Sequence, residues 1–167
     1  MDLAQMAGWL AAAAAIIAML QKSDLRLKQG LIIHTVLYGI HFALLGLPTA
    51  VISCVIALAR ISLSIYTRSL LCAAVLIIFS VATALAVSRS TVEAASVVLT
   101  LSLFRFDGIK LRLGLLGGGS VLWLIHNIYV QSWGGICLEA CFCLSTLWGL
   151  WTMVQEQNEN SKKEVCL

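Results

Sequence analysis

Six polar side chains lie inside long apolar stretches of this 167-residue chain: His34, His41, Arg60, His126, Asn127 and Glu139. An ionisable group in a hydrocarbon environment costs about 2.5–3.5 kcal/mol on insertion scales, so it needs a polar partner or a water-filled cavity. Imidazole titrates near neutral pH, and a nearby carboxylate favours its charged form. The set therefore indicates a pathway for protons or for a small polar solute.

Three of these residues are expected at a similar depth. His126 and Glu139 flank the tight turn near Gly134, and His41 precedes a second tight turn near Gly46. At a rise of 1.5 Å per residue, all three lie roughly 7–10 Å inside the outer boundary of an apolar span. We expect a hydrogen bond between His126 and Glu139, with His41 on the opposite wall of a central cavity. The alternative is a bond that only joins two helices.

Arg60 and His34 are predicted on the inner side of the same cavity. His34 precedes His41 by two helical turns and so shares its helix face. The long stem of Arg60 favours snorkelling to the inner surface. Binding of an anionic group and closure of a gate are the alternatives for Arg60. For His34 the alternative is an ordinary contact between helices.

The composition indicates that lipid surrounds most of the chain. Hydrophobic residues make up 60% of the sequence and charged residues 11%, and the mean hydropathy is +0.97, whereas about a quarter of a soluble domain is charged. A net charge of +3 without a long basic tract gives no footprint for nucleic acid. The six cysteines form no CxxC pair, so we expect no metal and no other cofactor.

Seven apolar segments approach the roughly 20 residues that a helix needs to cross a bilayer. We predict an all-α membrane protein with transmembrane helices over residues 3–20, 30–47, 48–66, 70–87, 91–103, 113–130 and 134–154. Residues 1–68 and 91–154 form two three-helix units, and residues 69–90 hold a linker helix. Residues 155–167 are polar, and we expect a frayed or disordered tail.

The basic residues gather at one end of the predicted helices. The connections at this end hold Lys22, Arg26, Lys28, Arg68, Arg105, Lys110 and Arg112. With an external N-terminus, all of these and the lysines of the tail face the cytoplasm, and Arg89 faces outward. Because cytoplasmic loops carry an excess of Lys and Arg, we predict an external N-terminus and a cytoplasmic C-terminus.

The order of features repeats along the chain. Each predicted unit has a helix, a basic connection, a second helix, a tight turn and a third helix. An offset of 85 residues places Ile40-His41 on Ile125-His126 and Pro48 on Trp133. Because a single helix joins the units, both have the same orientation in the membrane and are predicted to be parallel repeats.

Several segments resemble the YgjV-type family of bacterial inner-membrane proteins. They are GIHFALLG at 39–46, YTRS at 66–69, IHN at 125–127 and the Gly pair at 134–135. The resemblance covers most of the chain outside the tail and implies a protein of the bacterial inner membrane, without naming a mechanism. In that membrane, the external N-terminus predicted from the basic residues lies in the periplasm.

The arrangement of three, one and three helices resembles the SWEET and PQ-loop transporters and the PnuC-type vitamin transporters, by architecture alone. SWEET-like transporters carry hinge prolines in the first helix of each unit, whereas the one proline here, Pro48, lies in a turn. Gly114 and the run 117–119 are candidate flexible points, and close helix packing is the favoured alternative for them.

We predict a transporter or facilitator of a small polar solute, with proton coupling left open and a site between the two units. The alternatives are a membrane-embedded binding or assembly protein without transport, and a haem-binding electron-transfer protein with His41 and His126 as axial ligands. The sequence shows no catalytic triad pattern and no HExxH motif, so an enzyme is not expected. The expected partners are the lipid bilayer and the solute, and a homodimer through small interface residues stays open.

Overall fold

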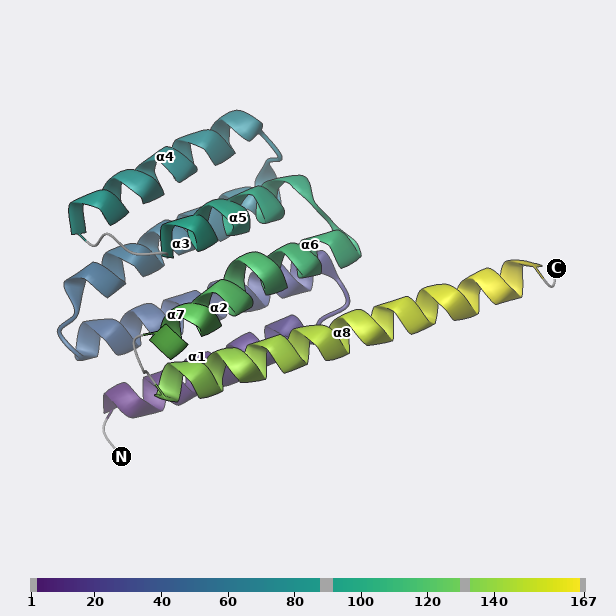
Figure 1. The fold of residues 1–167 in the computed structure, drawn as a ribbon, viewed down its shortest axis with the longest axis horizontal. Helices are drawn as coiled ribbons and strands as arrows, with labels where there is room; N and C mark the ends of the chain where they lie inside the picture. The colour runs from purple at the N-terminus through teal and green to yellow at the C-terminus, as the bar shows by residue number, and fades with distance from the viewer. Residues whose placement is uncertain (1–2, 88–91, 130–132, 166–167) are drawn as a thin grey trace.

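The computed structural model describes residues 3–87, 92–129 and 133–165 of the chain (Figure 1). Within these ranges every element is helical and no strand occurs, so the predicted all-α class is confirmed for this part of the chain. The elements are α1 (Leu3–Met19), α2 (Asp24–Leu44), α3 (Pro48–Tyr66), α4 (Leu70–Val87), α5 (Val92–Arg105), α6 (Gly108–Leu115), the π-helical η1 (Leu116–Val121), α7 (Leu122–Tyr129) and α8 (Trp133–Val165). Because α6, η1 and α7 follow one another without a break, the described residues form seven helices.

The helices pack in two layers of three, with α4 on the outside (Figure 1). In one layer α2 lies between α1 and α3, and in the other the α6–η1–α7 helix lies between α5 and α8. The layers meet where α1 contacts α8 and where α3 contacts α5. The first helix of each layer therefore contacts the third helix of the other. We use "basic end" for the end of the bundle where α1 joins α2, α3 joins α4 and α5 joins α6.

The bounds predicted for the third and fourth helices agree with α3 and α4. Helix α3 begins at Pro48, whose missing N–H is not needed in a first helical turn. The turn before it places Gly46 at a φ of 70°, which glycine adopts because it has no Cβ to clash. Pro48 and Gly46 together explain why the sequence predicts a tight turn at this position.

Two helices begin earlier than predicted. Helix α2 begins at Asp24 rather than residue 30, and α6 begins at Gly108 rather than residue 113. Ser23 and Asp107 occupy the N-cap positions with extended backbone angles, and both residue types favour the start of a helix. The basic segments predicted as connections are therefore mostly the first turns of helices.

The prediction of a frayed or disordered tail is wrong, because α8 continues to Val165. Residues 155–165 are rich in Glu, Gln and Lys, which are good helix formers, and contain no Gly or Pro that would end a helix. The preceding apolar turns supply the helix nucleus, so extension costs little. The last turns extend past the other helices (Figure 1).

Small residues allow close helix packing at the basic end. A Cβ on Gly30 of α2 would lie 2.6 Å from Ala18 Cβ of α1, and one on Gly114 of α6 would lie 2.6 Å from Ser102 Cβ of α5. Both distances are well inside van der Waals contact, so neither position has room for a side chain. Glycines of η1 also lie against α5, as expected for packing rather than for a hinge.

A cluster of buried apolar side chains fills the same end of the bundle. Its members come from α1 to α6 and are Ala18, Met19, Leu27, Leu31, Ile61, Ala73, Leu103, Phe104, Leu111 and Leu115. The polar connections of the basic end therefore cover a packed apolar layer to which both three-helix layers contribute.

We predict that Gly30→Ala lowers the free energy of unfolding in detergent by about 1–3 kcal/mol, as overpacking of a core does. Gly117→Ala is the matched control, because a Cβ there meets no atom within 4 Å. The double variant Ala18→Gly/Gly30→Ala should recover part of the loss. Equal stability of Gly30→Ala and Gly117→Ala would contradict the close approach of α1 and α2.

Candidate functional site

Three ring side chains stack along one face of α2. The ring centroids of His34 and Tyr38 are 5.4 Å apart with an interplanar angle of 25°, and those of Tyr38 and His41 are 5.8 Å apart at 5°. The spacing of four and three residues places them on one helix face. Tyr38 therefore lies between the two histidines that the sequence placed on one face, and it was not predicted as a site residue.

Both histidines are oriented by carbonyl oxygens of α1. Nδ1 of His34 lies 2.9 Å from Ala11 O, and Nδ1 of His41 lies 2.7 Å from Ala4 O. A carbonyl oxygen only accepts hydrogen bonds, so Nδ1 carries the proton in each ring and Nε2 is left for another partner. The small residues of α1 make its backbone accessible: a Cβ on Gly8 would lie 3.1 Å from the ring of His41.

Helix α8 of the other layer supplies the facing side of this site. Phe142 meets His34 edge to face, with ring centroids 5.9 Å apart. Glu139, one turn earlier on α8, is close enough to Tyr38 for an electrostatic interaction. Its Oε2 is buried and has no hydrogen-bond partner among the residues that the structure describes. His34, Tyr38, His41 and Glu139 therefore form a polar site between the layers, which we name the inter-layer site.

Arg60 lies elsewhere, between α3 and α5. The side chain is buried, with 8% exposure, and Nη1 donates to Thr100 Oγ1 over 3.2 Å. The expected snorkelling is therefore wrong, because a hydroxyl of the neighbouring helix receives the guanidinium inside the bundle. His34 bonds to α1 whereas Arg60 bonds to α5, so these hydrogen bonds link the two residues to different helices.

His126 and Asn127 belong to α7 by their backbone, but their side chains lie outside the described residues. The expected hydrogen bond between His126 and Glu139 stays a prediction. The same holds for haem ligation by His41 and His126. Among the residues that the structure describes, no group of three or more His, Cys, Asp or Glu side chains is arranged to hold a metal ion.

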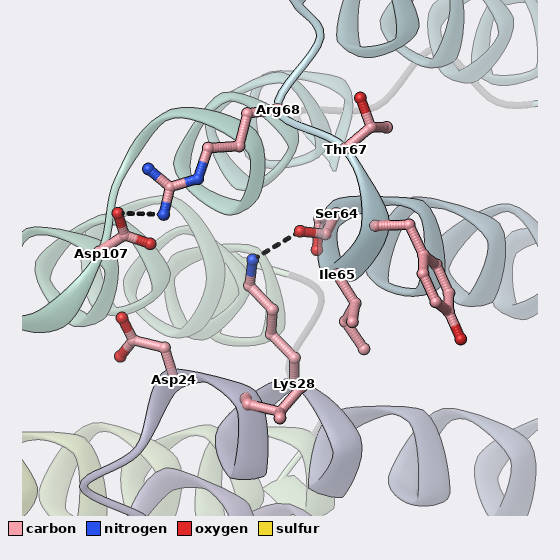
Figure 2. Close-up of a pocket in the computed structure, with 9 residues that line it drawn as sticks. Asp24, Lys28, Ser64, Ile65, Thr67, Arg68 and Asp107 are labelled. Atoms are coloured by element: carbon pink, nitrogen blue, oxygen red, sulfur yellow. Dashed lines mark hydrogen bonds and ion pairs between the residues drawn. The ribbon is translucent and has the colours of Figure 1, made fainter.

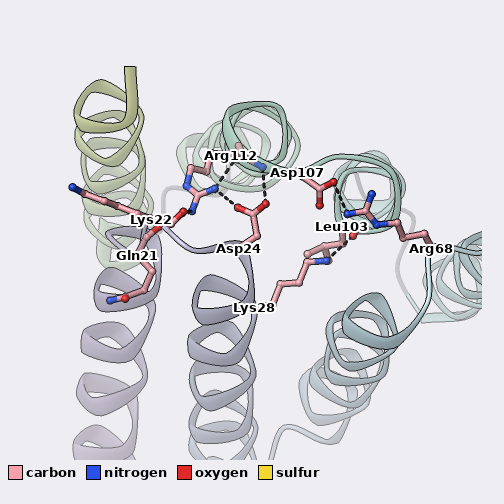
Figure 3. Close-up of polar contacts among 9 residues, drawn as sticks. Gln21, Lys22, Asp24, Lys28, Arg68, Leu103, Asp107 and Arg112 are labelled. Carbon is pink, nitrogen blue, oxygen red and sulfur yellow. Dashed lines mark hydrogen bonds and ion pairs between the residues drawn. The ribbon is translucent and has the colours of Figure 1, made fainter. Parts of the chain in front are cut away.

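Arg112 organises a second polar cluster, at the basic end (Figure 3). Its side chain is 1% exposed and pairs with the carboxylate of Asp24. Nη1 also donates to Gly108 O over 3.0 Å, and Nη2 donates to Gln21 O over 2.6 Å and to Lys22 O over 2.8 Å. Gln21 and Lys22 lie two and three residues past the end of α1, so the cation of α6 lies at the negative end of the α1 dipole.

Lys28 of α2 makes the reciprocal contact (Figures 2 and 3). Nζ donates to Ser64 O over 2.9 Å and to Leu103 O over 3.0 Å, in the last turns of α3 and α5. Lys28 precedes the apolar span predicted from residue 30. Burial lowers the pKa of its ammonium group, and the nearby carboxylates of Asp107 and Asp24 only partly oppose this effect. Each layer therefore sends one buried cation to the end of the first helix of the other layer.

An open cavity of about 410 Å³ lies beside Lys28 (Figure 2). The carboxylates of Asp24 and Asp107 and the cations of Lys28 and Arg68 line it, and Arg68 pairs with Asp107. Asp24 also accepts a hydrogen bond from Gly108 N over 2.6 Å, which joins the starts of α2 and α6. We name Asp24, Lys28 and Arg112 with their partners the basic-end network.

The sequence held a signal for this network. Leu25-Arg26-Leu27-Lys28 and Ile109-Lys110-Leu111-Arg112 show the same alternation of aliphatic and basic residues at an offset of 84. Leu27 and Leu111 are both fully buried, and Lys28 and Arg112 follow them. An offset of 85 residues aligns the two Ile-His pairs but misaligns these two basic motifs by one residue. The repetition of the basic motif was therefore not detected from the sequence.

Comparison with known proteins decides the family. A sequence profile described as a bacterial inner membrane protein family, Imp-YgjV, matches residues 2–157. The inner membrane protein YgjV of Escherichia coli (strain K12) is 30% identical over 147 residues, which cover 81% of this chain and 80% of that protein. The chain belongs to the YgjV family of bacterial inner membrane proteins. No solved structure matches it.

Membership of the YgjV family confirms the resemblance and the membrane class. By length and composition, one helix among the described residues is apolar enough to cross a bilayer, over Gly108–Ile125. Three more described helices are apolar over 10–17 residues: Leu3–Met19, Ala50–Tyr66 and Leu70–Ala82. The seven crossings, the orientation and the unit boundaries therefore stay predictions for this YgjV-family chain.

For this YgjV-family protein we predict that Asp24→Ala lowers the free energy of unfolding by about 3–5 kcal/mol, because it leaves the buried Arg112 charge without a counter-charge. Asp107→Ala is the matched control: its partner Arg68 has 69% side-chain exposure, and exposed ion pairs contribute about 0–1 kcal/mol. The measurement is chemical unfolding in detergent micelles.

A double-mutant cycle with Arg112→Met isolates this pair. If Asp24 acts through Arg112, the double variant loses less stability than the two single variants together. Additive losses would contradict the role assigned to Asp24.

Proposed function

We propose that this YgjV-family protein is a multi-pass transporter or facilitator of a small polar solute, with its solute site between two parallel three-helix units. The observation that carries the proposal is the inter-layer site, where imidazole, phenol and carboxylate groups gather inside an apolar bundle. Polar residues of this kind in membrane proteins commonly mark solute or proton pathways. The protein moves the solute without covalent chemistry.

The contacts between helices support the repeat organisation. α1 contacts α8 as α5 contacts α3, and Gly30 meets Ala18 as Gly114 meets Ser102, at an offset of 84 residues. The starts of α3 and α8 are offset by 85 residues. The π-helical η1 lies between the two regions, and a turn bonded from i to i+5 holds one residue more than an α turn. One extra residue in η1 accounts for the change of offset.

The basic-end network supplies a gate for this mechanism. Lys28 and Arg112 bind carbonyl groups of the opposite layer above a packed apolar cluster, and this cluster closes the bundle beneath the open cavity beside Lys28. Since Lys and Arg are concentrated there, we assign the basic end to the cytoplasm and the N-terminus to the periplasm. A closed cytoplasmic end and a polar inter-layer site together describe one state of an alternating-access cycle.

Uptake into proteoliposomes tests the proposal. The probes are radiolabelled sugars, amino acids, carboxylates and nucleosides, and we expect uptake of one of these classes. A hydrogen bond to a charged group contributes about 1.5–3 kcal/mol, so Glu139→Gln should raise the half-saturating concentration roughly 10- to 100-fold. His41→Ala and His126→Ala should also weaken uptake.

Glu156→Gln is the matched control, because Glu156 is an exposed carboxylate on the same helix. Uptake that responds equally to Glu139→Gln and Glu156→Gln would remove the inter-layer site. Absence of uptake for all four classes, with correctly folded protein, would contradict transport.

The gate has a separate test that needs no solute. Cys54 of α3 lies against Gly39, the residue after Tyr38 in α2, and the other five cysteines can be replaced by alanine so that Cys54 alone reports on this part of the bundle. We predict that Lys28→Met increases labelling of Cys54 by a membrane-impermeant maleimide applied from the cytoplasmic side. Arg26→Met, at an exposed basic position of the same helix, should leave labelling unchanged. Unchanged labelling in both variants would show that Lys28 does not close the pathway.

A membrane-embedded binding or assembly protein is the second candidate, favoured by one observation. The polar last turns of α8 extend past the bundle and end near the C-terminus (Figure 1). Past Glu156, which pairs with Lys22, residues 157–159 of this helix are exposed and available to a partner. Co-purification of one protein with the full chain, lost on deletion of residues 157–167 while uptake is absent, would favour this candidate over transport.

A further inference from the structure

A second cavity, of about 400 Å³, lies beside the first and shares Arg68 and Asp107 with it. Its lining residues are Arg68, Arg105, Phe106, Asp107 and Lys110. They come from the connection between α3 and α4, the last residue of α5, the connection between α5 and α6, and the first turn of α6. Three cations and one carboxylate thus meet where α3 joins α4 and α5 joins α6.

The charges of this cavity are not balanced. The one carboxylate, Asp107, pairs with Arg68. Neither Arg105 nor Lys110 has a carboxylate partner in the part of the chain that the structure describes. The first N–H of α6 is already taken, because Gly108 N donates to Asp24, so the excess positive charge comes from Arg105 and Lys110. The cavity is therefore suited to an anion.

Exposed apolar side chains adjoin the cationic cavity. Phe106 lines it, and Leu70 and Leu71 begin α4 directly after the Arg68 connection, with Leu71 74% exposed. In an inner membrane protein such a surface faces acyl chains. A ligand that matches both parts has an anionic head beside an apolar tail. A free phosphate ion and an acidic peptide lack the apolar tail.

We propose that this cavity binds the phosphate group of an anionic glycerophospholipid of the surrounding membrane. Arg105 and Lys110 contact the phosphate oxygens, while Phe106 and the start of α4 pack against the acyl chains. Basic pockets at the ends of membrane helices recognise lipid headgroups in this way. The proposal is independent of the transport proposal, because none of these residues belongs to the inter-layer site.

Native mass spectrometry of the full chain tests the lipid site. The protein is released from nanodiscs of equal phosphatidylglycerol and phosphatidylcholine with identical acyl chains, and the retained lipids are counted. We expect wild-type protein to retain phosphatidylglycerol preferentially, and Arg105→Gln/Lys110→Gln to lose roughly tenfold or more of that preference. Lys22→Gln/Arg26→Gln removes the same charge at the same end and should keep it.

The other possible results of this measurement either overturn the lipid site or support it. An unchanged preference in Arg105→Gln/Lys110→Gln overturns it, and so does an equal loss in both double variants, which would indicate a general charge effect. Displacement of the lipid by millimolar inorganic phosphate, or by a polyglutamate peptide, would indicate a free-anion or peptide site instead. Charge-conserving Arg105→Lys/Lys110→Arg should retain the lipid, which separates loss of the site from a folding defect.

Discussion

The basic end depends on the burial of one guanidinium group. Removing a cation from water is costly unless a counter-charge and hydrogen bonds surround it. For Arg112 these come from Asp24, Gly108 and the two carbonyls that follow α1. The ends of α1, α2 and α6 therefore have fixed relative positions, and the close approaches at Gly30 and Gly114 become compatible with one bundle.

Lys28 makes the matching contact in the opposite direction, so the two layers hold each other through two buried cations. One layer alone would satisfy neither cation, because each takes carbonyl partners from the other layer. Separation of the layers at this end therefore exposes two sets of buried polar groups at once. For the proposed transporter, this coupling makes opening of the cytoplasmic end cooperative rather than gradual.

Much of the fold was accessible from the sequence. Apolar length located every helix, and Pro48 with Gly46 gave the start of α3, because these residues have strong local preferences. The starts of α2 and α6 were missed because Lys28 and Arg112 count as polar in a hydropathy reading. Only tertiary contacts show that these cations are buried. The end of α8 was missed because low hydropathy was taken as disorder, although helix propensity continues past the apolar part of the helix.

The site was predictable only in part. His34, His41 and Glu139 were found because ionisable groups are rare in apolar helices. Tyr38 was overlooked because a tyrosine in such a helix has many ordinary roles, and its importance comes from stacking between two histidines. Arg60 was misplaced because a spacing argument cannot tell which neighbouring helix offers a hydroxyl. Pairing across the layers is a property of the assembled bundle.

The length of α8 has a mechanical consequence. From Gln155 to Val165 the helix rises about 16 Å at 1.5 Å per residue. The same rigid rod carries Glu139 and Phe142 near its other end. Any tilt of α8 that accompanies rearrangement of those two side chains moves its C-terminal tip through a larger arc. A spectroscopic label near the C-terminal tip of α8 would therefore report a tilt of the helix that begins at the distant inter-layer site.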